Sequence, residues 1–124
     1  MEPIKRFEDL ECWKAARLLV KEVYTYSQTG ELSRDWDTKS QIKRAALSVM
    51  NNIAEGFGRF GAQDSLRFYD IAKASTYEVK SMLYVLEDVN YLTQDQLGIL
   101  GKLTDNTLNL TLGWIRHLTK TLKH

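Results

Sequence analysis

Four stretches of this sequence carry apolar residues at intervals of three and four, and no stretch alternates apolar with polar residues as a strand does. Such an interval matches the 3.6-residue turn of an α-helix, so each stretch can bury one face of a helix. The sequence therefore predicts an all-α protein in which four helices share one core. The predicted helices span residues 9–28, 34–57, 62–90 and 94–122.

Short breaks separate the four predicted helices. Gly30 follows the first helix, and three glycines lie within residues 56–61. Thr93 and Gln96 have the spacing of a capping box, which marks the start of the last helix. Because short connections leave consecutive helices side by side, we predict an up-down-up-down antiparallel four-helix bundle. The length predicts a single domain over residues 1–124.

Composition excludes several classes of protein. The 17 basic and 16 acidic residues give a net charge of +1, whereas a surface devoted to phosphate is usually far more basic. Apolar runs are short and interrupted by polar residues, and the first residues lack the apolar stretch of a signal peptide. The single cysteine allows no internal disulfide. We therefore expect a cytoplasmic protein that does not enter a membrane.

The second predicted helix has more apolar surface than one core contact needs. One stripe of small and branched residues is Ile42, Ala45, Ala46, Val49, Ile53 and Gly56. A second stripe, about a quarter-turn away, is Trp36, Leu47, Met50, Ala54 and Phe57. The third helix adds an outward line of Leu66, Tyr77 and Tyr84 beside its predicted core stripe. That core stripe is Phe68, Ile71, Ala72, Ser75, Val79, Met82, Leu86 and Val89. Exposed apolar patches of this kind indicate an interface, so we predict self-association.

Polar residues on the second and third helices could converge near one end of the bundle. They are Asn52, Glu55, Arg59, Ser75 and Glu78. Such residues can form a buried network that fixes helix register, with Arg59 neutralising a carboxylate. They can also form an active site in which Glu55 and Glu78 pair as acid and base. The network is favoured because no nucleophile or histidine lies nearby in the sequence.

Metal and thiol chemistry find little support in the sequence. The chain contains no Glu-x-x-His, the motif with which bundle proteins hold di-iron centres. Cys12 lies on the flank of the first predicted helix, where a small packing residue is expected. We therefore predict no metal, no cofactor and no catalytic residue.

Three groups of basic residues could contact phosphate. They are Lys39, Lys43 and Arg44, then Lys73 and Lys80, and last Arg116, Lys120 and Lys123. The middle group flanks Tyr77 and Tyr84, so cations and stackable rings share one face, as in proteins that bind single-stranded nucleic acid. A solvated face, or an oligomer contact through the tyrosines, explains the same pattern and is favoured for a single chain.

The run from Gln41 to Arg59, QIKRAALSVMNNIAEGFGR, resembles the signature of a bacterial family of four-helix bundles. Its members are known as 23S rRNA intervening-sequence proteins, or S23 ribosomal-protein-like proteins. Flanking residues agree with this resemblance: Phe7, Leu10, Trp13, Phe68, Ile71, Ala72, Ser75 and Glu78. The resemblance implies a four-helix bundle, commonly a homopentamer, with no established enzymatic activity. It also implies a genomic link to ribosomal RNA genes and a distant kinship with accessory proteins of diversity-generating retroelements, which engage nucleic acid as basic pentamers.

The leading hypothesis is a non-enzymatic homo-oligomeric module, with a pentamer favoured, that associates with a nucleic-acid or ribonucleoprotein complex. A direct RNA- or DNA-binding protein is the alternative, using the lysine–tyrosine face and the basic C-terminal turns. An enzyme built on Glu55 and Glu78 is a remote alternative. No small-molecule substrate is expected.

Overall fold

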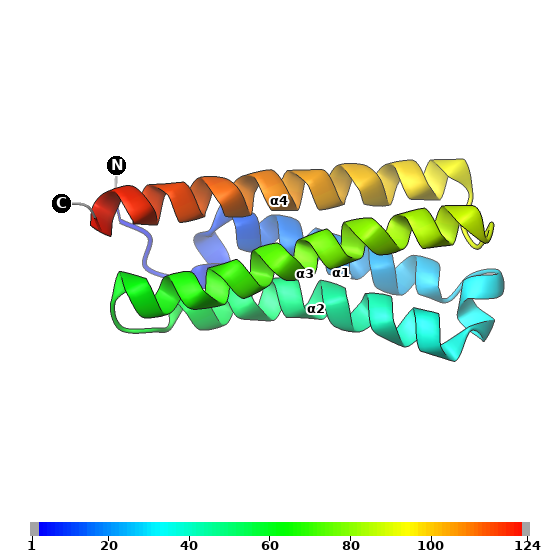
Figure 1. Cartoon of the computed structure of the whole chain (residues 1–124), viewed down its shortest axis with the longest axis horizontal. Helices are drawn as coiled ribbons and strands as arrows, with labels where there is room; N and C mark the ends of the chain where they lie inside the picture. Colours follow the sequence, from blue (N-terminus) through cyan, green and yellow to red (C-terminus); the bar gives the residue numbers. More distant parts are fainter. Residues whose placement is uncertain (1–2, 123–124) are drawn as a thin grey trace.

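Four long helices run side by side in the computed structural model, which describes residues 3–122 (Figure 1). They are α1 (Glu11–Ser27), α2 (Trp36–Phe57), α3 (Ala62–Asp88) and α4 (Gln94–Leu122). Two short 3-10 turns, η1 (Phe7–Asp9) and η2 (Glu31–Arg34), precede α1 and α2. Residues 3–122 contain no strand, and each helix boundary lies within two residues of its predicted position. The all-α four-helix prediction is confirmed.

Capping interactions explain where α2 and α4 begin. The carboxylate of Asp35 accepts hydrogen bonds from the backbone N–H of Thr38 at 3.1 Å and from the hydroxyl of Tyr91 at 2.9 Å. These bonds hold the pKa of Asp35 below its usual value, because they favour the charged form. At α4, the N–H of Thr93 donates to Gln96 Oε1 and the N–H of Gln96 donates to Thr93 Oγ1. The predicted capping box is confirmed.

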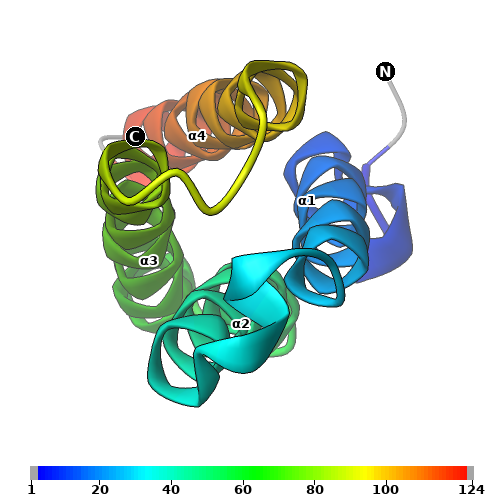
Figure 2. The ribbon, with the colours of Figure 1, turned by 90° about the vertical axis from the view of Figure 1, so that its right-hand side faces the viewer.

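The helices follow one another around the bundle in chain order (Figure 2). Helix α1 packs against α2 and α4, and α3 packs against the same two helices. Consecutive helices run in opposite directions (Figure 1). The contact between α1 and α2 therefore lies on the opposite side of the bundle from the contact between α3 and α4.

Two clusters of buried side chains fill the bundle, one towards each end. Leu19, Ile42 and Leu86 belong to the cluster near the α1–α2 and α3–α4 connections. The other cluster surrounds Val49 and Tyr69. Three threonines of α4, all without exposed surface, lie between these clusters: Thr104, Thr107 and Thr111. Each hydroxyl donates to the carbonyl four residues earlier, at 2.6–2.7 Å, so the polar groups are satisfied inside the core.

The core face of α3 was predicted incorrectly in part. Ile71 and Val89 are 43% and 47% exposed. Four residues absent from the predicted stripe are buried instead: Ser65, Tyr69, Thr76 and Leu83. Apolar side chains occur on every side of α3, so their spacing alone does not select the buried direction. The positions of α2 and α4 select it. Across residues 3–122, none of the helices is both long enough and apolar enough to cross a membrane.

Candidate functional site

A small polar network joins α2 to α3 in the middle of their contact. The hydroxyls of Ser48 and Ser75 lie 2.7 Å apart, and either can donate. The amide of Asn52 donates to the carbonyl and to the hydroxyl of Ser48, at 2.8 and 3.0 Å. Because Ser75 is buried and the other two are half-buried, these bonds favour one register of α2 against α3.

The predicted convergence of five polar residues is wrong for three of them. Exposed Glu55 pairs with exposed Arg59 at 3.1 Å, within α2 and the turn that follows it. Glu78 instead accepts a hydrogen bond from Gln41 Nε2 at 3.5 Å. The reason is the antiparallel direction of α3, which carries residue 78 away from the end of α2 that holds Glu55. Fourteen residues of helix between residues 41 and 55 place the two carboxylates roughly 20 Å apart.

Gly56, within the same sequence signature, allows α2 to approach α3 closely. A Cβ at this position would lie 2.9 Å from Tyr69 Cε1 and 3.1 Å from the backbone oxygen of Ser65. The ring of Tyr69 is buried, so it has little room to move. Beyond the glycine, the guanidinium of Arg59 stacks over the Phe68 ring at 4.5 Å. The signature residues of α2 thus serve helix packing.

The predicted interface residues divide into exposed and half-buried groups. Trp36, Tyr77 and Tyr84 are 71%, 51% and 62% exposed. The half-buried group is Leu47, Met50, Phe57 and Leu66. Met50 and Phe57 pack against a core cluster of the same chain, so the second apolar stripe of α2 is partly used internally. Side chains of η1 and the start of α1 reach this part of α2, and the sequence pattern of α2 alone does not reveal them.

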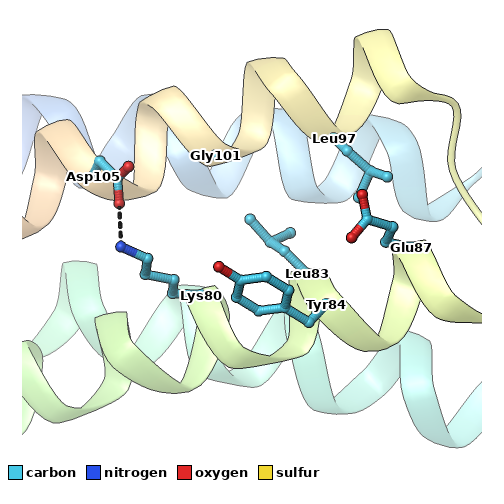
Figure 3. A pocket seen from close by; sticks show the side chains of 7 residues that line it. All are labelled: Lys80, Leu83, Tyr84, Glu87, Leu97, Gly101 and Asp105. Atoms are coloured by element: carbon cyan, nitrogen blue, oxygen red, sulfur yellow. Dashed lines mark ion pairs between the residues drawn. The ribbon is translucent and has the colours of Figure 1, made fainter.

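A groove lies between α3 and α4 on the outside of the bundle (Figure 3). Its pocket has a volume of about 190 Å³ and is lined by Lys80, Leu83, Tyr84, Glu87, Leu97, Gly101 and Asp105. Lys80 and Asp105 point towards one another across the groove, with 2.9 Å between Nζ and Oδ1 (Figure 3). The hydrogen bond and charge of Asp105 raise the pKa of Lys80. A Cβ added to Gly101 would have no atom within 4 Å, so the groove is open there.

The predicted phosphate contacts do not form one surface. Lys73 pairs with Asp70 at 3.8 Å and Lys80 with Asp105, so the lysine–tyrosine face is largely neutralised. Lys39 donates to the carbonyl of Ser33, near the start of α2. Exposed Arg116 and Lys120 belong to the far end of α4, at the opposite end of the bundle (Figure 1). Lys123 lies outside the described residues.

The structure contains a basic face between α1 and α2 that was not predicted, because the predicted groups of basic residues each came from a single helix. It consists of Arg17 and Lys21 of α1, which line a groove against α2, and Lys43 of α2, which stacks over Tyr24 of α1. Arg44, the next residue of α2, is exposed on the outer side of that helix. None of these four cations takes part in an ion pair among residues 3–122. The signal was present in the sequence, because residues 12–21 and 38–54 contain six Lys or Arg and no Asp or Glu. Only the packing of α1 beside α2 shows that the two stretches share a face.

The only cysteine is a packing residue in the structure. Cys12 is buried, and burial raises the pKa of its thiol to about 11. At neutral pH the thiol is therefore protonated and a poor nucleophile. In the part of the chain that the structure describes, no three His, Cys, Asp or Glu side chains gather as metal ligands would.

Comparison with known proteins gives one family and one fold. Residues 8–113 match the family described as 23S rRNA-intervening sequence protein. A crystal structure from Bacteroides thetaiotaomicron VPI-5482, of a protein with unknown function from the S23 ribosomal protein family, has a TM-score of 0.77 to this chain. The two sequences are 20% identical, and the match covers 85% of this chain and 95% of the other. This similarity shows a common fold. The curated proteins include none that matches the chain.

Proposed function

The chain belongs to the family of 23S rRNA-intervening sequence proteins, and from this premise we propose that it is a non-enzymatic module that assembles with copies of itself. A pentamer is the favoured assembly. The assembled module associates with a nucleic-acid or ribonucleoprotein complex, as the name of the family suggests. The proposal includes no cofactor and no small-molecule substrate.

The observation that carries self-assembly is the apolar surface of α3 that its own chain leaves uncovered. Four large apolar side chains of this helix are between 43% and 62% exposed, namely Ile71, Tyr77, Tyr84 and Val85, and Val89 just after the helix is 47% exposed. Burying apolar surface contributes about 25 cal/mol for each Å² removed from water. Tyr77 and Tyr84 are seven residues apart and so share one outward line, and neighbouring exposed rings of this kind are more typical of a protein contact than single exposed apolar residues.

Light scattering coupled to size-exclusion chromatography, at several protein concentrations, tests this proposal. We expect a mass well above the 14.3 kDa of one chain, with five times that mass favoured. Tyr77→Ser combined with Tyr84→Ser should lower the mass without loss of helical circular dichroism, because both rings are exposed. Phe60→Ser is the matched control, since Phe60 is 99% exposed in the connection between α2 and α3, at the other end of the bundle from the α3–α4 connection. A 14.3 kDa species for the parent protein at all concentrations contradicts the proposal.

Direct binding of RNA or DNA is a second candidate function, and the α1–α2 basic face supports it. The unpaired cations there could replace the counterions of a phosphate backbone. This location differs from the lysine–tyrosine face expected from the sequence, whose cations are paired. A labelled single-stranded RNA should then bind at low salt, with an affinity that falls steeply as salt rises. Absence of binding at low salt removes this candidate.

The absence of enzymatic activity is also part of the proposal. Glu55 and Glu78 form the acid–base pair of the remote enzymatic alternative, and at a separation of roughly 20 Å the two carboxylates cannot reach the same reacting atom. Each carboxylate has its own partner, Arg59 or Gln41. Replacing both with Gln should leave the assembled mass unchanged. A loss of the assembly in this variant would assign the two carboxylates to the interface.

A further inference from the structure

We propose that copies of this chain associate face to back, with the α1–α2 basic face of one copy covering the α3–α4 groove of the next. This inference rests on the proposed self-assembly and names the two surfaces that meet. The occupant of the groove is therefore a second copy of the same chain.

The α1–α2 basic face offers unpaired positive charge with apolar surface between the cations. Arg17 and Lys21 are exposed and line a groove between α1 and α2, together with Leu18 and Met50. The one acidic residue in this lining, Glu8, pairs with Arg6 at 3.2 Å. Leu18 is 53% exposed. Lys43 stacks over the Tyr24 ring at 4.5 Å, which directs its charge to the same contact between the helices. A partner for this face should be acidic and partly apolar.

The hairpin of α3 and α4 offers the complementary surface. Residues 81–101 contain no Lys or Arg, and their acidic residues are Glu87, Asp88 and Asp95. All three are exposed, and none takes part in an ion pair among residues 3–122. Glu87 lines the α3–α4 groove beside the exposed ring of Tyr84 (Figure 3). This surface is acidic and partly apolar.

The positions of the two surfaces allow one copy to make both contacts at once, one with each neighbour. They lie on opposite sides of the bundle, because α1, α2, α3 and α4 follow one another around it (Figure 2). Lys21 and Lys43 adjoin the core cluster that contains Leu86 and Leu92, near the α3–α4 connection. Two different surfaces produce a head-to-tail contact, which closes into a ring when the rotation between copies permits and otherwise continues as an open filament.

The balance of charge and apolar surface favours a second copy over nucleic acid as the partner. A phosphate backbone would pair with the cations and leave Leu18 and the α3–α4 groove uncovered. A second copy covers both, and the net charge of +1 brings no strong repulsion between copies. The complementary charges set orientation and partner choice, and the apolar side chains contribute most of the affinity.

Charge reversal on each surface tests the contact. Arg17→Glu with Lys21→Glu changes the basic face, and Glu87→Lys with Asp88→Lys changes the acidic hairpin. The second pair lies at the end of α3, where lysine also suits the helix dipole. Each double variant should run at 14.3 kDa at concentrations where the parent protein is oligomeric. The chain that carries all four substitutions should regain the oligomer, because its two surfaces are complementary again.

A matched control tests whether a change in net charge alone is enough to dissociate the oligomer. Arg116→Glu with Lys120→Glu makes the same change of charge at two exposed positions of α4, far from both surfaces. This variant should keep the mass of the parent. Circular dichroism and the unfolding midpoint of every variant show whether the bundle is intact, so that loss of the oligomer is not confused with unfolding.

The measured masses distinguish a failure of the proposed self-assembly from a failure of this particular contact. A monomeric parent protein overturns the proposed self-assembly itself. An oligomeric parent with both double variants still oligomeric overturns this contact and leaves self-assembly standing. If Arg17→Glu with Lys21→Glu keeps the oligomer but abolishes retention of a labelled single-stranded RNA, the basic face binds nucleic acid and the proposed contact is wrong.

Discussion

Helix α3 has one side closed by α2 and one side left open beside α4. Both contacts contain a glycine, and the two glycines have opposite surroundings. At Gly56 on the closed side, a Cβ would lie 2.9 Å from the Tyr69 ring. At Gly101 on the open side, a Cβ would have no atom within 4 Å. The fold requires the first glycine, and nothing within residues 3–122 requires the second.

The polar groups of the two sides differ in the same way. On the closed side, the Ser48 and Ser75 hydroxyls satisfy one another between the helices. On the open side, Lys80 and Asp105 meet at the surface, with Tyr84 exposed beside them. The closed side therefore holds the chain together, and the open side leaves apolar and acidic surface available for a partner. Substitutions on the two sides should accordingly change the free energy of unfolding by different amounts and in opposite directions.

Gly56→Ala should have the largest effect on stability. The added methyl group overlaps the buried ring of Tyr69, and overpacking of this kind costs about 1–3 kcal/mol. Higher helix propensity of alanine offsets part of that loss. Urea unfolding followed by circular dichroism, at one fixed protein concentration, measures the change. Unaltered or higher stability would mean that α2 and α3 separate at this point without cost.

Ser75→Ala should destabilise the chain by about 1 kcal/mol, because the Ser48 hydroxyl loses its partner on α3. The double variant Ser48→Ala with Ser75→Ala should lose less than the sum of the single variants, since neither hydroxyl is then left unpaired. Urea unfolding of the parent, the two single variants and the double variant measures the energetic coupling between the two hydroxyls. Simple additivity would indicate that the two hydroxyls do not depend on one another.

Gly101→Ala should stabilise the single chain by up to about 1 kcal/mol, measured in the Arg17→Glu, Lys21→Glu background in which no second copy is expected to cover the groove. Alanine has the higher helix propensity, and the open groove leaves room for its methyl group. The substitution is chemically the same as Gly56→Ala, so opposite signs in one urea experiment would demonstrate the difference between the two sides of α3. A loss of stability at Gly101 would show that the groove is filled.

Asp105→Asn should have the smallest effect at neutral pH, because the ion pair it removes is exposed to water and screened by salt. The pair raises the pKa of Lys80 above its ordinary value of 10.5. Its contribution to stability is therefore complete below that value and is lost as the pH rises through the raised pKa of the folded state. Thermal unfolding at neutral and alkaline pH should show the two proteins converging above pH 10.5. A constant difference would assign the effect to something other than Lys80.

Local patterns in the sequence were enough to predict most of the fold. Apolar spacing located four helices, and the capping residues Thr93 and Gln96 marked the start of the last one. The signature in α2 was correctly associated with packing, although its residues act separately. Asn52 belongs to a network with Ser48 and Ser75, whereas Glu55 pairs with Arg59 on the surface. The expected convergence failed because it depended on the register between two helices.

The sequence by itself determined the helices, their ends and their antiparallel order, because helix periodicity, capping and short connections act between residues that are close along the chain. The tertiary structure alone decided which side of α3 is buried, because its apolar residues point in all directions and only α2 and α4 select among them. It also brought Arg17 and Lys21 beside the helix that carries Lys43, and placed this basic face on the opposite side of the bundle from the α3–α4 groove. Surfaces of this kind arise from residues distant in sequence, so their charge and position follow from helix packing.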